Sequence, residues 1–102
     1  MSHLVLWEFR PRPGRAKDFE AAYGPEGAWV RFFRKSDAYL GSELLRDEAD
    51  PSRYLTVDRW ISRECYEEFR RRYSSEYQEL DGRCELLTEH EARLGLFRTL
   101  DP

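Results

Sequence analysis

One short segment of the sequence brings together side chains that could do acid–base chemistry. In the stretch RYLTVDRWIS, Tyr54, Thr56, Asp58 and Trp60 occupy alternate positions. Alternate residues of a β-strand lie on one face, so these four side chains would share a surface. Burial raises the pKa of a carboxyl group, which would let Asp58 accept a proton near neutral pH. We therefore expect Asp58 and Trp60 to be catalytic, and Tyr54 and Thr56 to bind the substrate.

The same residues have structural interpretations that the sequence alone leaves open. Asp58 could instead be a structural acid that pairs with a partner on a neighbouring strand or subunit. Tyr54 and Trp60 could pack across a contact between two subunits, because such interfaces are enriched in tyrosine and tryptophan. Arg59 alternates with aliphatic residues, and we expect its guanidinium to bond an acid on a helix.

A second group of candidates surrounds a break in the first helical region. Helical spacing runs from Gly14 to Tyr23, where the stretch YGPEG interrupts it, and Pro25 does not suit a helix interior. We expect a kink or a restart there, followed by the helical stretch AWVRFFRKS. A broken helix is a usual place for the mouth of a pocket, so we expect Tyr23 and Trp29 to bind substrate. Packing in the core is the alternative for both residues.

The elements that would position these side chains follow from hydrophobic periodicity. Residues 3–9, 38–47, 53–61 and 92–100 have the pattern of strands. Ser62 is a natural N-cap for a helix. The helix would carry one continuous apolar stripe, made of Tyr66, Phe69, Tyr73, Tyr77, Leu80, Cys84 and Leu87. The order β-α-β-β-α-β predicts a ferredoxin-like α+β fold, with a four-stranded antiparallel sheet and the helices on one face.

The two faces of the predicted sheet differ in composition. Leu55, Val57, Arg59 and Ile61 share one side of the strand, and because they are mostly aliphatic we place them under the helices. The set that contains Asp58 would then point to the open face. Two open faces packed around a two-fold axis would close a barrel-like dimer with room for a ligand inside.

Composition limits the classes of function. The 102 residues suit a single domain spanning 1–102. With a net charge of −3 and no unneutralised basic stripe, nucleic acid is not expected as a partner. Short apolar runs and the lack of a signal peptide predict no membrane contact and a cytoplasmic location. The four histidine and cysteine residues, His3, Cys65, Cys84 and His90, show no metal-ligand spacing.

Several stretches, taken in order, carry a resemblance to a known family. They are WEF near the start, PG before the first helix, YGPEGAWVRFF, YLGSELLRD, RYLTVDRWISRECYEEF and EARLGLF. The sequence is similar to the antibiotic biosynthesis monooxygenase (ABM) domain family of dimeric α/β barrels. The resemblance implies a homodimer and a cofactor-free monooxygenase that acts on a small phenolic or other aromatic metabolite. It implies neither a cofactor nor a metal.

The resemblance also marks two differences. Many members carry a histidine near position 69, where this chain has Phe69, which we assign to the substrate-binding residues. A resemblance to the haem-degrading branch of the family would imply an asparagine in the first strand, whereas this chain contains no asparagine. The alternative function is a non-catalytic ligand-binding or assembly module of the same fold. A ligand-sized cavity would favour an enzyme or binder, and an interior filled by side chains would favour an assembly module.

Overall fold

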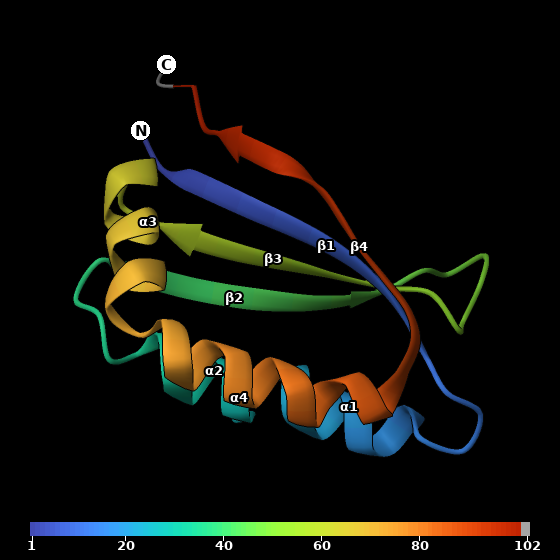
Figure 1. Ribbon diagram of the computed structural model, residues 1–102. Helices are drawn as coiled ribbons and strands as arrows, with labels where there is room; N and C mark the ends of the chain where they lie inside the picture. The colour runs from blue at the N-terminus through green and yellow to red at the C-terminus, as the bar shows by residue number, and fades with distance from the viewer. Residues whose placement is uncertain (101–102) are drawn as a thin grey trace.

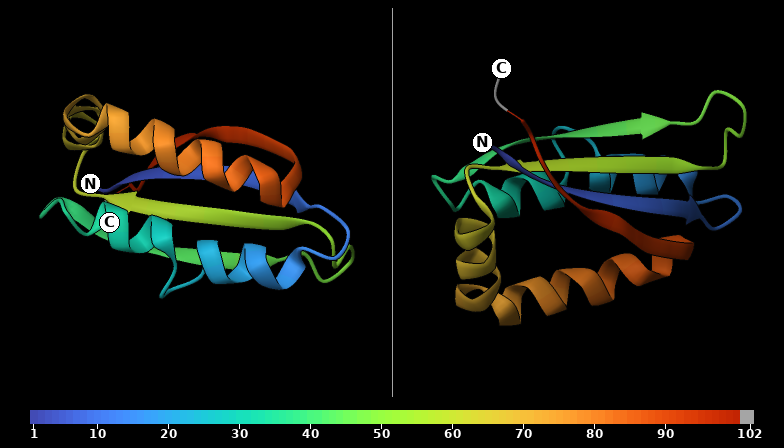
Figure 2. Two further views of the ribbon diagram at one scale, coloured as in Figure 1. Left: turned by 60° about the horizontal axis from the view of Figure 1, so that its bottom comes forward. Right: turned by 90° about the horizontal axis from the view of Figure 1, so that it is seen from above.

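Four strands form one sheet, and helices cover a single face of it (Figures 1 and 2). The computed structural model describes residues 1–100. No helix in this part of the chain is both long and apolar enough to cross a membrane. The elements, in chain order, are β1 (His3–Pro11), α1 (Ala16–Tyr23), α2 (Ala28–Phe33), β2 (Tyr39–Arg46), β3 (Tyr54–Trp60), α3 (Arg63–Arg72), α4 (Ser74–Cys84), the 3₁₀ turn η1 (Glu85–Leu87) and β4 (Thr88–Arg98).

The strands lie in the order β2-β3-β1-β4, and every neighbouring pair is antiparallel. This arrangement confirms the predicted ferredoxin-like α+β fold. In the β2–β3 hairpin, Ser42 lies opposite Asp58 and Leu44 lies opposite Thr56. The register of β1 against β3 places Val5 opposite Asp58. Asp58 therefore lies in a central strand, with neighbours on both sides.

The break between the first two helices occurs where the sequence predicted it. α1 ends at Tyr23 and α2 begins at Ala28. Gly27 allows the close approach of the two helices, because a Cβ atom there would lie 2.2 Å from the carbonyl oxygen of Ala22 and 2.5 Å from that of Ala21. No side chain fits in that space, so glycine determines how α2 starts against the end of α1.

The second helical region differs from the single helix that the apolar stripe predicted. The chain leaves helical geometry at Tyr73, with φ −112° and ψ 31°, so α3 and α4 run in different directions (Figure 2). Ser62 caps α3 as predicted, its hydroxyl accepting a hydrogen bond from the backbone N–H of Cys65 at 3.1 Å. β4 also begins earlier than predicted, at Thr88, so that His90 belongs to this strand.

The structure reverses the predicted assignment of the two faces. Tyr54, Thr56 and Trp60 are buried beneath the helices, and Asp58 shares their side of β3. The aliphatic set faces the open side, where Ile61 is 50% exposed. The error has a physical reason: an aliphatic row indicates burial but does not say whether a helix layer or a second sheet will cover it.

The expectation for Arg59 is corrected with the faces, and His3 is buried near the same end of the sheet. Arg59 pairs with Glu43 on the adjacent strand β2 at 3.1 Å, and not with an acid on a helix. His3 is 5% exposed and lies beneath α3, with its ring 5.5 Å from that of Tyr66. The bend after α3 makes this possible, because it brings α3 over the end of the sheet where β1 begins (Figure 1).

Candidate functional site

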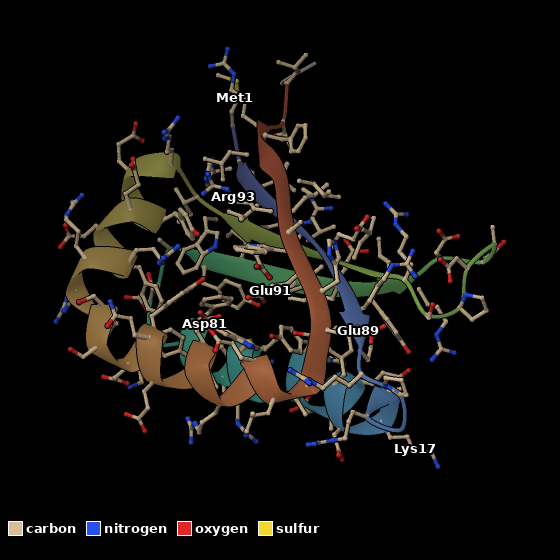
Figure 3. The ribbon with its side chains drawn as sticks, turned by 45° about the vertical axis from the view of Figure 1, so that its right-hand side comes forward. Met1, Lys17, Asp81, Glu89, Glu91 and Arg93 are labelled. Carbon is tan, nitrogen blue, oxygen red and sulfur yellow. The ribbon has the colours of Figure 1, made fainter. Side chains whose placement is uncertain are left out.

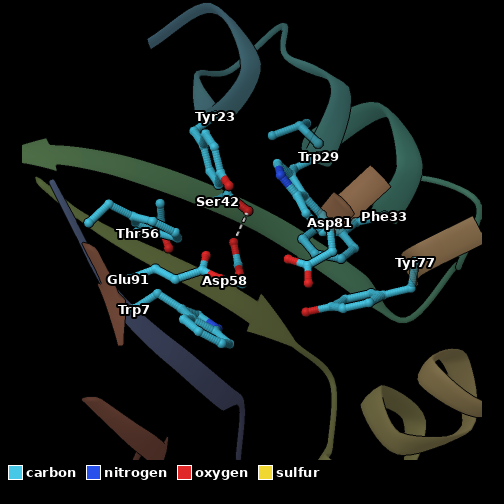
Figure 4. Close-up of a pocket in the computed structure, with 12 residues that line it drawn as sticks. Trp7, Tyr23, Trp29, Phe33, Ser42, Thr56, Asp58, Tyr77, Asp81 and Glu91 are labelled. Carbon is cyan, nitrogen blue, oxygen red and sulfur yellow. Dashed lines mark hydrogen bonds between the residues drawn. The ribbon is translucent and has the colours of Figure 1, made fainter. Parts of the chain in front are cut away.

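A cavity of about 40 Å³ lies between the sheet and the helices (Figure 4). Side chains from β1, β2, β3 and β4 form its floor and sides, and α1, α2 and α4 close it from above. Because Glu91 on β4 is exposed and also borders the cavity, the cavity reaches the surface beside this strand. The lining residues are Trp7, Phe9, Tyr23, Trp29, Val30, Phe33, Ser42, Thr56, Asp58, Tyr77, Asp81 and Glu91.

Asp58 is the acidic group on the floor of this cavity, and its partner is a hydroxyl group. Ser42 on the neighbouring strand donates a hydrogen bond to Asp58 Oδ1 at 2.6 Å (Figure 4). The Tyr39 hydroxyl lies 2.5 Å from the same Ser42 oxygen. Within residues 1–100, no lysine, arginine or histidine forms an ion pair with Asp58. The carboxyl group is therefore held in place without being neutralised.

Burial controls the protonation of Asp58. Removal from water raises the pKa of Asp58 to about 6, and the hydrogen bond from Ser42 opposes part of this increase. A carboxyl group with this pKa is mostly ionised at neutral pH, yet it is a stronger base than an ordinary surface aspartate. Such a group is suited to take a proton from a bound ligand.

Neutral hydrogen-bond donors surround the carboxyl group. The indole N–H of Trp29 is buried and has no hydrogen-bond partner among the described residues. The Tyr23 hydroxyl and the Cys84 thiol each affect the pKa of the other, and both lie near this indole. Neither forms a hydrogen bond with the indole N–H. Burial raises the pKa of Tyr23 and of Tyr77, so both phenols stay protonated. The cavity thus combines one base with donors that an oxyanion could accept from.

The surface end of the cavity is acidic. Glu91 on β4 and Asp81 on α4 both border it, and Figure 3 shows these two residues together with Arg93. Burial raises the pKa of Asp81, with a further contribution from the charge of Glu85. Burial likewise raises the pKa of Glu91, and the charges of Asp81 and Glu85 add to it. These carboxyl groups repel one another, which disfavours a ligand whose anionic group would lie between them.

The structure brings four of the seven predicted site residues together. Tyr23, Trp29, Thr56 and Asp58 all line the cavity. Tyr54, Trp60 and Phe69 do not. The hydroxyl of Tyr54 bonds Glu20 and Arg46 at the other end of the sheet.

Trp60 and Phe69 belong to the aromatic core beside the cavity. Trp60 is fully buried, and its ring packs 5.4 Å from that of Phe33 and 5.1 Å from that of Phe69. Neither Trp60 nor Tyr54 lies on the open face, so neither packs across a contact made by that face. Trp60 lies behind Phe33, which itself borders the cavity, so it has no surface with which to touch a ligand there.

The sequence did not predict eight of the lining residues as part of the site: Trp7, Phe9, Val30, Phe33, Ser42, Tyr77, Asp81 and Glu91. Ser42 had a usable signal, because a hairpin turn centred on residue 50 places position 42 opposite position 58. Tyr77 was read as part of a continuous core stripe, and only the bend at Tyr73 turns it toward the cavity. Asp81 and Glu91 come together through tertiary contacts that no local pattern reports.

The residues that the structure describes contain no group of three or more histidine, cysteine, aspartate or glutamate side chains arranged to hold a metal ion. The polar atoms of the cavity are one carboxylate, hydroxyl groups and an indole N–H, with the two further acids at the surface end. This set of groups is suited to bind and deprotonate an aromatic hydroxyl compound.

The fold and the cavity define the class of protein: an α+β ferredoxin-like domain with an aromatic cavity between its sheet and its helices. The sequence model of the family described as antibiotic biosynthesis monooxygenase matches residues 2–79. The chain belongs to this family. No curated protein matches the sequence significantly.

Solved structures with the same fold cover almost the whole chain. Rv0793 from Mycobacterium tuberculosis is 23% identical, with a TM-score of 0.73, and the match covers 100% of this chain and 98% of that one. SnoaB, a cofactor-independent oxygenase from Streptomyces nogalater, is 14% identical, with a TM-score of 0.72 and coverage of 99% and 95%. PA3566 from Pseudomonas aeruginosa is 16% identical, with a TM-score of 0.72 and coverage of 98% and 95%.

Proposed function

We propose that this protein is a cofactor-independent monooxygenase that oxidises a small phenolic compound in the cavity beneath the sheet. The observation that carries the proposal is the position of Asp58, a largely desolvated carboxyl group in an aromatic cavity, with no cationic partner among the described residues. The family and the likeness in fold to a cofactor-independent oxygenase support the same chemistry.

The proposed reaction converts a ring CH₂ group flanked by phenol rings into a carbonyl group. Asp58 takes a proton from the substrate, which leaves an electron-rich carbanion or phenolate. This anion reduces O₂, and a carbon–oxygen bond forms to give a hydroperoxide. Loss of water then leaves one oxygen atom on the carbon as C=O, while the other departs in the water together with the two hydrogens. The substrate supplies all the electrons, so the balance needs no other reductant.

The side chains around Asp58 would stabilise the anionic substrate. The free N–H of Trp29 and the protonated hydroxyl groups of Tyr23 and Tyr77 are donors for a developing oxyanion. Aromatic walls from Trp7 and Phe33 would pack against the substrate rings and keep water away from the intermediate. Thr56 lies beside Asp58 on the same face of β3 and adds a further hydroxyl group.

The size of the cavity places a condition on this proposal. A water molecule needs about 10–15 Å³ of such space, so about 40 Å³ holds only a few waters. A phenolic substrate must therefore displace side chains at the surface end. Glu91, which is exposed, and Asp81 and Tyr77, which are partly exposed, have the most freedom to move.

Oxygen uptake tests the proposal directly. With a dihydroxyanthrone as substrate, we expect Asp58→Asn to lower the rate of uptake by about 100-fold or more, the usual effect of losing a general base. Glu43→Gln is the matched control, because Glu43 is an acid on the opposite face of the sheet and pairs with Arg59. Uptake that is equal in Asp58→Asn and in Glu43→Gln would rule out Asp58 as the base.

A non-catalytic binding module of the same fold is the second candidate. Phenylalanine at position 69, where many relatives carry histidine, favours it. This candidate predicts that phenolic compounds quench the fluorescence of Trp7 and Trp29 but are recovered unchanged after incubation with O₂. The monooxygenase predicts the carbonyl product.

We further propose that two copies of the chain pair through the open face of the sheet. That face carries Leu55 and Val57 at its centre, with Ile61 and Phe97 each 50% exposed. Exposed apolar surface on a sheet usually marks an interface. A two-fold axis through this face would give the homodimer that the family resemblance implies, with both cavities outside the contact.

A further inference from the structure

A groove rich in arginine lies between α3 and β4. Its volume is about 310 Å³. α3 contributes Arg63, Tyr66, Glu67, Arg70 and Arg71, and β4 contributes Arg93 and Leu96. The groove therefore brings four guanidinium groups together.

Two of these arginines are neutralised by acids on the same helix. Arg63 pairs with Glu67 at 3.4 Å, and Arg71 pairs with Glu68 at 2.7 Å. Both pairs are exposed to solvent, so they are typical of a helix surface.

Neither of the other two arginines forms an ion pair with a carboxylate among residues 1–100, although the charge of Arg70 acts to lower the pKa of Asp81. Arg70 donates a hydrogen bond to the Tyr66 hydroxyl at 2.9 Å, and its guanidinium carbon lies 3.8 Å from the centre of the Tyr77 ring. Arg93 forms no ion pair or hydrogen bond with any residue in the range 1–100. Stacking on Tyr77 restricts the motion of Arg70, which lowers the entropy lost when it binds an anion.

The groove and the cavity share a boundary. Tyr77, on which Arg70 stacks, lines the cavity. Arg93 lies opposite Trp7 in the β1–β4 pairing and two residues beyond Glu91, and both of these neighbours also line the cavity. Figure 3 shows Arg93 and Glu91 following each other along β4. A ligand with its ring in the cavity could therefore reach Arg70 and Arg93 with a substituent.

We propose that Arg70 and Arg93 bind a carboxylate group of the ligand whose aromatic ring occupies the cavity. This inference rests on the proposed function for the position of the ring, and it narrows the substrate class to phenolic carboxylic acids. Guanidinium groups bind a carboxylate through paired N–H donors. The acids Asp81 and Glu91 at the surface end of the cavity repel a carboxylate, so the charges of the two regions fix one orientation of the ligand.

The test compares two probes that differ by one carboxylate. 6-Hydroxy-2-naphthoate and 2-naphthol are titrated against the full-length protein, with tryptophan fluorescence as the readout. We expect the carboxylate probe to bind about tenfold or more tightly than the neutral probe, because charge-assisted hydrogen bonds contribute at least this much. We expect Arg93→Gln to remove this difference and to leave the affinity for 2-naphthol unchanged.

The control variant is Arg72→Gln, on the same helix but outside the groove. Arg70→Gln provides a second test on the other side of the groove, and its circular dichroism spectrum shows whether loss of the stacking on Tyr77 has unfolded the protein. Equal affinity for the two probes in the unmodified protein overturns the inference. An equal effect of Arg93→Gln and Arg72→Gln on the carboxylate probe overturns it too.

The outcome is separable from that of the proposed function. A preference for the carboxylate probe that depends on Arg93, combined with oxygen uptake that does not depend on Asp58, supports the anion site and contradicts the monooxygenase. Uptake that depends on Asp58, without any preference for the carboxylate probe, supports the monooxygenase and contradicts the anion site. If neither probe binds, both the anion site and the proposed ligand class are wrong.

Discussion

At the scale of single residues, the proposed chemistry depends on the environment of Asp58. Its carboxyl group accepts a hydrogen bond from Ser42 and is not paired with any base in the described part of the chain. The other titratable groups that border the cavity are acids and phenols: Asp81, Glu91, Tyr23 and Tyr77. None of them can stabilise an ionised Asp58 by an opposite charge, so ionisation of this carboxyl group lowers the stability of the folded state.

This cost predicts that Asp58→Asn stabilises the protein at high pH. The pKa of Asp58 is raised from 3.8 to about 6, so the folded state favours the protonated form. The protonated Asp58 makes a favourable contribution to the free energy of unfolding. This contribution is fully present below pH 3.8 and is lost as the pH rises through about 6. At pH 8 the ionised form costs about 3 kcal/mol. Urea unfolding should show Asp58→Asn more stable than the unmodified protein at pH 8, with the difference vanishing near pH 4. A constant difference across this range would contradict the raised pKa.

Ser42 influences the pH range in which Asp58 would act as a base under the proposed mechanism. Its hydrogen bond lowers the pKa of Asp58 against the effect of burial. We therefore expect Ser42→Ala to move the acidic limb of the pH–rate profile for oxygen uptake to higher pH, while the rate at the plateau changes less. Ser75→Ala, an exposed substitution on α4, is the control. If the limb stays in place in Ser42→Ala, the hydrogen bond has no influence on the base.

At the scale of elements, the order of strands and helices follows from local patterns, and the contacts between them do not. Strand patterns and the YGPEG break predicted all four strands, the last of them with a start four residues too late, and the separation of α1 from α2. The apolar stripe beyond Ser62 has the same spacing on both sides of Tyr73, so a single helix was the natural prediction. The bend depends on the backbone of Tyr73, and it directs α3 over the end of β1.

The location of the site also depends on contacts between elements, which local patterns do not predict. The residues around Asp58 could be grouped on one face of β3, because alternation is a local property. Which face receives the helices depends on packing, and here the rings of Phe19, Phe33 and Phe69 pack against Tyr54 and Trp60. The predicted site set was thus divided between the cavity and the core, and the acids from α4 and β4 could not be foreseen.

Two glycine substitutions test the role of the α1–α2 junction. In Gly27→Ala the new Cβ would collide with backbone carbonyl oxygens at 2.2 and 2.5 Å, which cannot move away easily. We expect a loss of about 1–3 kcal/mol in the free energy of unfolding, as for other cases of overpacking. Gly82→Ala is the matched control in α4, where nothing lies within 4 Å. It should gain about 0.5–1 kcal/mol from helix propensity. Thermal or urea unfolding measures both, and equal effects would contradict the close approach at Gly27.

At the scale of the whole molecule, the two faces of the sheet have separate roles in this account. The face under the helices carries the cavity, and the open face carries the proposed contact with a second copy. This division explains why the aliphatic row of β3 is only partly buried in one chain. It also means that dimerisation and catalysis can be changed independently.

A charged substitution on the open face should separate the subunits. We expect Val57→Lys to convert a dimer into a folded monomer, because a lysine at the centre of the apolar face would lose its hydration in the contact. Leu86→Lys is the control, since Leu86 is 65% exposed in η1, away from the sheet. Size-exclusion chromatography with light scattering gives the mass, and circular dichroism confirms folding. A monomeric unmodified protein, or a dimer that survives Val57→Lys, would contradict the proposed contact.

The central claim is that Asp58 acts as the base for the reaction of a phenolic substrate with O₂, and the pH dependence of oxygen uptake tests it most directly. In the unmodified protein, uptake with a dihydroxyanthrone should rise with pH to a plateau, with a midpoint near 6, the pKa of Asp58. In Asp58→Asn, this rise should disappear and only a slow residual rate should remain. The same midpoint and the same rate in both proteins would contradict the account.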